Sequence, residues 1–151
     1  MISDAHQGAR FATLDIKDHF LQSILPEPEY MRIHSKYFFD DIKSKYDIDK
    51  LVNEDGYVYC KIIKGMYGLK QAALLGRENI INVLKPFGYY PDPIAPNIWR
   101  HQTLPTKFCL CVDDFGVKYH STKDLQHLIT ALQLAFKVTV DYEINSIVAY
   151  H

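Results

Sequence analysis

The sequence contains no long apolar run and few cysteines. No stretch approaches the roughly 18 apolar residues of a membrane-spanning helix, and residues 1–20 lack the apolar core of a secretory signal peptide. The three cysteines are Cys60, Cys109 and Cys111. Cys109 and Cys111 would point to one face of one strand, where a disulfide between them has poor geometry. We therefore expect no membrane association, reduced thiols, and an intracellular location in the cytoplasm or nucleus.

The chain also lacks an excess of either charge. Its formal net charge is -1, whereas an independent nucleic-acid-binding domain usually has a basic excess. Nucleic-acid binding would therefore require the charges to be segregated between faces. The length of 151 residues, with 48% hydrophobic and 23% charged residues, indicates one globular domain.

An acidic pair between two apolar segments is the most informative feature present. Residues 108–112 are all apolar, Asp113 and Asp114 follow, and the apolar segment 115–117 comes next. This pattern predicts a hairpin with two carboxylates at its tip. Carboxylates held on a buried sheet are costly unless a cation neutralises them, and hard oxygen ligands suit Mg²⁺. The pattern therefore points to phosphoryl-transfer chemistry.

Hydrophobic periodicity elsewhere predicts an α+β fold. The strands are expected at 10–16, 30–33, 57–63, 97–101 and 138–142, and the helices at 20–25, 35–46, 69–84 and 121–136. This order predicts a mainly antiparallel sheet with two long helices packed on one face. We expect a single domain over residues 1–151, because no repeat or linker divides the chain.

A third carboxylate, Asp15, ends the first predicted strand. If this strand lies beside the acidic hairpin, Asp15 joins Asp113 and Asp114 in one cluster. Three carboxylates within about 5 Å cannot all stay ionised without cations. Two divalent ions about 3.5–4 Å apart are a common arrangement in phosphoryl transfer.

Four segments occur in an order that resembles a known family. They are Asp15–Phe20 (DIKDHF), Tyr30–Ile33 (YMRI), Lys64–Ala72 (KGMYGLKQA) and Val112–Tyr119 (VDDFGVKY). In this order they resemble the reverse transcriptase of copia-type retrotransposon Pol polyproteins. The resemblance implies a reverse-transcriptase palm-like, ferredoxin-like fold and RNA-directed DNA polymerase activity. It also implies that the family's fingers are largely missing, that its thumb and RNase H are absent, and that the chain alone is poorly active.

The resemblance assigns catalysis and metal binding to the acidic cluster. Asp15, Asp113 and Asp114 would be the catalytic carboxylates and would hold two Mg²⁺ or Mn²⁺ ions. The main-chain carbonyl of Ile16 would also touch metal. Two such ions activate an attacking oxygen and neutralise a leaving phosphate.

The resemblance also implies a substrate-binding set. Phe20 would be the steric gate, whose ring crowds a ribose 2′-OH and favours deoxynucleotides. Tyr67 and Gly68 would border the incoming base and the template, and Lys70 would contact phosphate. Phe20 and Tyr67 also suit plain packing, and Lys70 suits solvent. We expect His19 at the surface.

The implied partners are an RNA or DNA template-primer and deoxynucleoside triphosphates. Two other readings remain open. One is a non-catalytic palm domain that acts as a binding or interaction module. The other is an unrelated ferredoxin-like domain that uses two metals for another phosphoryl transfer, such as nucleotide cyclisation, although the YGLKQA segment argues against it.

Overall fold

The structure, a computed structural model, describes residues 8–142. The strands are β1 (Arg10–Ile16), β2 (Ile24–His34), β3 (Tyr57–Lys64), β4 (Tyr89–Pro91), β5 (Ile98–His101), β6 (Lys107–Cys111), β7 (Asp114–Tyr119) and β8 (Val138–Asp141). The α-helices are α1 (Asp40–Tyr46), α2 (Lys70–Leu84) and α3 (Thr122–Gln133). Short 3₁₀ turns are η2 (Phe20–Gln22), η3 (Ser35–Tyr37), η4 (Ile48–Lys50) and η5 (Lys85–Phe87). Within the described residues, no helix is both long and apolar enough to cross a membrane.

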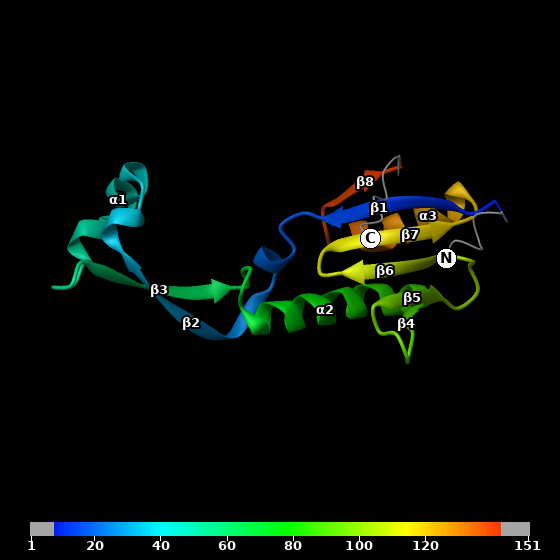
Figure 1. The fold of residues 1–151 in the computed structure, drawn as a ribbon, viewed down its shortest axis with the longest axis horizontal. Coiled ribbons are helices and arrows are strands. Elements are labelled where there is room, and N and C mark those ends of the chain that lie inside the picture. The colour runs from blue at the N-terminus through cyan, green and yellow to red at the C-terminus, as the bar shows by residue number, and fades with distance from the viewer. Residues whose placement is uncertain (1–7, 143–151) are drawn as a thin grey trace, which may run out of the picture.

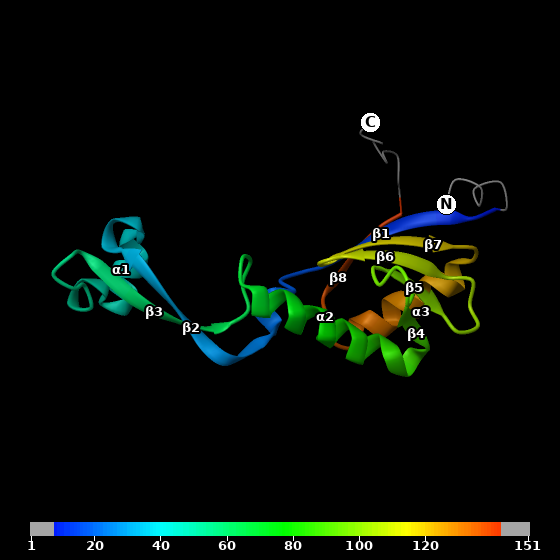
Figure 2. The same ribbon diagram turned by 60° about the horizontal axis from the view of Figure 1, so that its bottom comes forward.

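Six strands form one sheet in the order β4-β5-β6-β7-β1-β8, and every pairing in it is antiparallel. Figure 2 shows α2 and α3 below this sheet, on the same face. The expected α+β class with a mainly antiparallel sheet is therefore confirmed. The three α-helices differ in length, and only α2 and α3 contribute to the core of the sheet.

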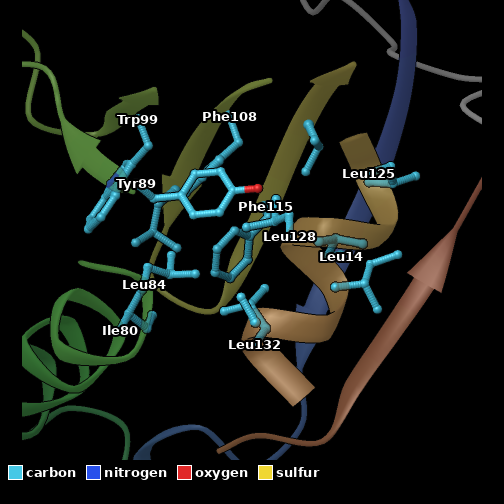
Figure 3. Packing of buried hydrophobic residues seen from close by; sticks show 14 of the residues in the cluster. Leu14, Ile80, Leu84, Tyr89, Trp99, Phe108, Phe115, Leu125, Leu128 and Leu132 are labelled. Atoms are coloured by element: carbon cyan, nitrogen blue, oxygen red, sulfur yellow. The ribbon is translucent and has the colours of Figure 1, made fainter. Parts of the chain in front are cut away.

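The core lies between the six-stranded sheet and the two long helices (Figure 3). Alternate residues of β1 are buried, as expected for a strand covered on one face. Leu14 from β1 meets Ile80 and Leu84 of α2 and Leu128 of α3 in one cluster. Each fully buried side chain of this kind stabilises the fold by about 1.5–3 kcal/mol. This packing fixes the ends of β1, β6 and β7, where the acidic residues lie.

Helix α3 begins with a complete capping box at its N-cap residue, Ser121. The Ser121 side chain accepts a hydrogen bond from the Asp124 backbone N–H, and the Asp124 carboxylate accepts one from the Ser121 N–H. The backbone N–H groups of Ser121 and Asp124, which the start of a helix would leave unpaired, both find hydrogen-bond acceptors in this way. The cap confirms the start of α3 that the sequence predicts.

Strands β2 and β3 form a separate two-stranded sheet that carries α1 at its far end. Figures 1 and 2 show this lobe projecting away from the six-stranded sheet. Its base is held by a Gly65 N–H that donates to the Ser23 carbonyl at 2.8 Å. The Gln71 side chain also donates to Glu29 at 2.8 Å. The lobe is therefore attached to the rest of the protein at its base, and the remainder of its length projects away from the six-stranded sheet.

The prediction of a helix at residues 20–25 is wrong. Only the single turn η2 forms there, and β2 begins at Ile24 and pairs with Lys64. Pro26 and Pro28 explain the difference, because proline supplies no N–H and pushes the preceding residue toward extended backbone. The apolar spacing that imitates a helix belongs to a turn followed by an irregular strand.

The helix expected at residues 35–46 is also only partly right. It is broken into η3 and α1, with Phe39 in extended conformation between them. Phe39 and Tyr46 are exposed, so the apolar side of this segment does not face the main core.

Candidate active site

The structure brings the acidic residues to one end of the large sheet. Asp15 of β1 lies directly opposite Asp114 of β7 in the antiparallel ladder. Residues opposite each other share a face, with Cβ atoms about 4.5–5.5 Å apart. The Ile16 N–H donates to the Asp113 carbonyl at 3.1 Å, so the third acidic residue is fixed beside the same pair. The first strand thus lies beside the acidic hairpin, as the sequence predicts.

The hairpin tip is a two-residue turn under backbone strain. Only Val112 and Asp113 separate β6 from β7. Val112 has a φ of 61°, in the left-handed region that β-branched residues rarely adopt. Such a residue costs about 1–3 kcal/mol unless surrounding structure enforces it. Here the buried strands on both sides of the turn enforce it and hold Asp113 at the tip.

The three carboxylates affect one another. Partial burial raises the pKa of Asp15, and the negative charges of Asp113 and Asp114 raise that pKa further. Repulsion of this kind is what a bound cation would relieve.

Tyr67 lies in the loop before α2 and contacts the cluster of acidic residues. Its hydroxyl donates to Asp113 Oδ2 at 2.6 Å, and this hydrogen bond raises the pKa of the Tyr67 phenol. The Tyr67 ring meets the Phe20 ring edge-on, with centroids 4.7 Å apart. Phe20 is only 6% exposed and is therefore buried, although its ring also borders a cleft beside Tyr67.

A cleft of about 420 Å³ joins the candidate substrate-binding residues. Its lining includes Phe20, Tyr67, Gly68, Lys70, Asp113 and Asp114. Gly68 has a φ of 91° and open space where a Cβ would lie, so this position both requires glycine and faces the opening. The cleft therefore connects the expected steric gate to the acidic tip, whereas Asp15 and Ile16 of β1 are not part of its lining.

The oxygen donors in this cluster are of the type that Mg²⁺ or Mn²⁺ prefers. The Ile16 side chain is buried, so only its main chain is available to a metal. In the described part of the chain, however, no three His, Cys, Asp or Glu side chains converge as a ready-made metal site. Asp113 is held by Tyr67 instead. The donor types fit a divalent cation, and the Tyr67 hydroxyl would compete with such a cation for Asp113 Oδ2.

His19 lies inside the protein, not at the surface as expected. It is 2% exposed and packs edge-on against Phe136. Burial lowers its pKa, and Asp113 opposes that shift only in part. Its Nδ1 has no hydrogen-bond partner among residues 8–142. The signal that would have placed it is Gly76 in the middle of α2, where any Cβ would lie 2.5 Å from His19 Nε2.

No protein-family model matches the chain, and a search of curated proteins finds no significant match. The resemblance to reverse transcriptases therefore depends on the ordered sequence motifs alone.

Proposed function

We propose that this chain is the palm of a copia-type RNA-directed DNA polymerase. The cross-strand pair of Asp15 and Asp114, with Asp113 beside it, carries this proposal. These carboxylates meet at the end of an antiparallel sheet backed by two helices, which supports the palm-like, ferredoxin-like reading of the fold. The reaction is nucleotidyl transfer from a deoxynucleoside triphosphate to a primer end paired with an RNA or DNA template.

In this proposal, the carboxylates and the Ile16 carbonyl would hold two Mg²⁺ or Mn²⁺ ions. Such ions would supply activation of the primer oxygen and neutralisation of charge on the leaving phosphate. Asp113 would offer its Oδ1, and its Oδ2 as well where the Tyr67 hydroxyl gives up its hydrogen bond.

The chain's other groups orient the nucleotide. The Phe20 ring borders the cleft and is braced by Tyr67, so it can crowd a ribose 2′-OH. Lys70 begins α2, where its ammonium adds to the positive end of the helix dipole and favours phosphate. Gly68 leaves room for a base or sugar to lie against the backbone. Positioning of this kind accounts for much of phosphoryl-transfer catalysis.

A second function, a non-catalytic palm that acts as a binding module, is favoured by one observation. Tyr67 occupies Asp113, and the described side chains form no ready-made metal site. A binding module would keep this arrangement permanently.

Single-nucleotide addition to a DNA primer on an RNA template, with Mn²⁺ at low salt, separates the two functions. We expect weak template-directed addition that Asp113→Asn abolishes. Asp49→Asn, the same change on the exposed lobe, is the matched control and should retain it. Binding of the template-primer by a wild-type chain that neither adds a nucleotide nor binds Mn²⁺ would favour the binding module.

A further inference from the structure

One face of the β2–β3 hairpin alternates aromatic rings with cations. Tyr30 pairs with Lys61 and Arg32 pairs with Tyr59, so these four side chains share one face of the ladder. Tyr30 is 67% exposed and Tyr59 is 63% exposed, which is unusual for two large rings on one small sheet. We call this set, Tyr30, Arg32, Tyr59 and Lys61, the tyrosine–cation face.

Strand β2 carries two carboxylates, Glu29 in the regular ladder and Glu27 in the irregular stretch before it. Glu29 lies on the opposite face, where it accepts a hydrogen bond from Gln71 of α2. That opposite face also carries Met31 and Val58, which are half-buried and buried. The tyrosine–cation face therefore presents positive charge although the whole chain has a net charge of -1.

The rings on this face are kept apart. Tyr30 and Tyr59 are diagonal neighbours in the ladder, and among the described residues their rings make no contact with each other. The Arg32 guanidinium lies 4.2 Å from the centroid of the next ring, Tyr57, and is ordered by that cation–π contact. Each exposed ring therefore has a cation directly across or beside it and a free aromatic surface.

We propose that the tyrosine–cation face binds single-stranded nucleic acid, with bases stacked on Tyr30 and Tyr59 and phosphates bound by Arg32 and Lys61. Stacking rings interleaved with cations are what a single strand requires, because every base has an aromatic surface and every linkage a negative charge. A protein-docking face would need contiguous apolar area, whereas cations separate these rings. Binding here uses no metal ligand and so goes beyond the proposed catalysis.

The position of the face suits a strand that continues toward the cleft. Strand β3 ends at Lys64, and the chain reaches Tyr67 at the cleft three residues later. The eight residue-to-residue steps from Tyr59 to Tyr67 span at most about 28 Å of extended chain. A bound strand of modest length would therefore reach from the hairpin to the cleft.

The test is fluorescence anisotropy with labelled 12-nucleotide oligouridylate and oligothymidylate, using the full chain in EDTA at low salt. EDTA removes any contribution from the acidic cluster, so the result does not depend on the proposed catalysis. We expect the double variant Tyr30→Ala, Tyr59→Ala to bind at least about tenfold more weakly. The double variant Tyr30→Phe, Tyr59→Phe keeps both rings and should bind like wild type.

A matched control lies on the same lobe. Tyr37 and Tyr46 are exposed tyrosines with Lys36 and Lys45 over their rings, but they lie outside the ladder. Their double alanine variant should bind like wild type. The proposal is overturned if wild type binds neither oligonucleotide, if the control loses as much affinity, or if the Tyr30, Tyr59 alanine variant binds within twofold of wild type.

Salt dependence tests the cations separately. Replacing Arg32 and Lys61 by glutamine should reduce the slope of log affinity against log salt by about 1.4, or about 0.7 for each lost phosphate contact. An unchanged slope would remove the cations from the interface and contradict the proposal.

Discussion

Gly76 is the position where one methyl group should distort the approach of α2 to the active-site region. A Cβ there would lie 2.5 Å from His19 Nε2 and 3.1 Å from His19 Cδ2, and real Cβ atoms essentially never approach so closely. The His19 ring cannot simply swing aside, because it is 2% exposed and packed against the rings of Phe20 and Phe136. Gly76→Ala therefore forces a shift of α2 or of the segment that follows Asp15.

Two terms decide the size of the effect. Alanine in a helix interior is favoured over glycine by about 1 kcal/mol. Overpacking a buried contact costs about 1–3 kcal/mol. Gly76→Ala should thus lower the free energy of unfolding by up to about 2 kcal/mol, or leave it nearly unchanged, instead of raising it. With His19→Ala the obstacle is gone, and the same substitution should stabilise by about 1 kcal/mol.

The assay is urea unfolding of four proteins: wild type, each single variant and the double variant. We expect a coupling free energy of about 1–3 kcal/mol between the two positions, as for residues in direct contact. Additive effects within about 0.5 kcal/mol, with Gly76→Ala stabilising in both backgrounds, would refute the close packing of α2 on His19.

Three further predictions concern the site and its support. Tyr67→Phe should raise Mn²⁺ affinity about three- to tenfold in a titration, because the metal no longer competes with the hydroxyl for Asp113; equal affinity would argue against that competition. Asp15→Asn should raise stability in EDTA at pH 7 by less than about 1 kcal/mol, since the raised pKa of Asp15 means that its charged form is disfavoured in the folded state. That gain should vanish at pH 3, below the ordinary carboxyl pKa of 3.8, and a gain of equal size at both pH values would exclude charge repulsion as its cause. Ser121→Ala should lower the free energy of unfolding by about 0.5–2 kcal/mol through loss of the capping box, measured by urea unfolding beside the exposed Ser44→Ala as control.

The elements that the sequence predicts well are those with a strong local signal. The acidic hairpin has an apolar strand on each side, α2 has a sustained helical stripe, and α3 has its capping box at Ser121. In each case the pattern, the propensity and the boundary residues agree, so tertiary contacts only reinforce the local preference. The pairing of Asp15 with Asp114 follows once β1 and β7 are neighbours.

The elements that the sequence predicts poorly have conflicting local signals. Strand β2 contains Pro26, Pro28 and a register shift, so its apolar residues do not alternate regularly. The three-residue strand β4 is too short to show a period and exists through its pairing with β5.

The side-chain arrangement of the site is harder still to predict. The contact of Tyr67 with Asp113 joins residues 46 positions apart, and the burial of His19 depends on α2 packing against it at Gly76. Both are tertiary consequences that no local pattern encodes.

We propose that Asp15, Asp113 and Asp114 together hold divalent cations. The most direct test is titration of the chain with Mn²⁺ followed by electron paramagnetic resonance, with the double variant Asp15→Asn, Asp113→Asn and the control Asp49→Asn beside wild type. We expect saturable Mn²⁺ binding by wild type and by the control, and loss of that binding in the double variant. Equal binding by the double variant, or no saturable binding by wild type, would contradict this proposal.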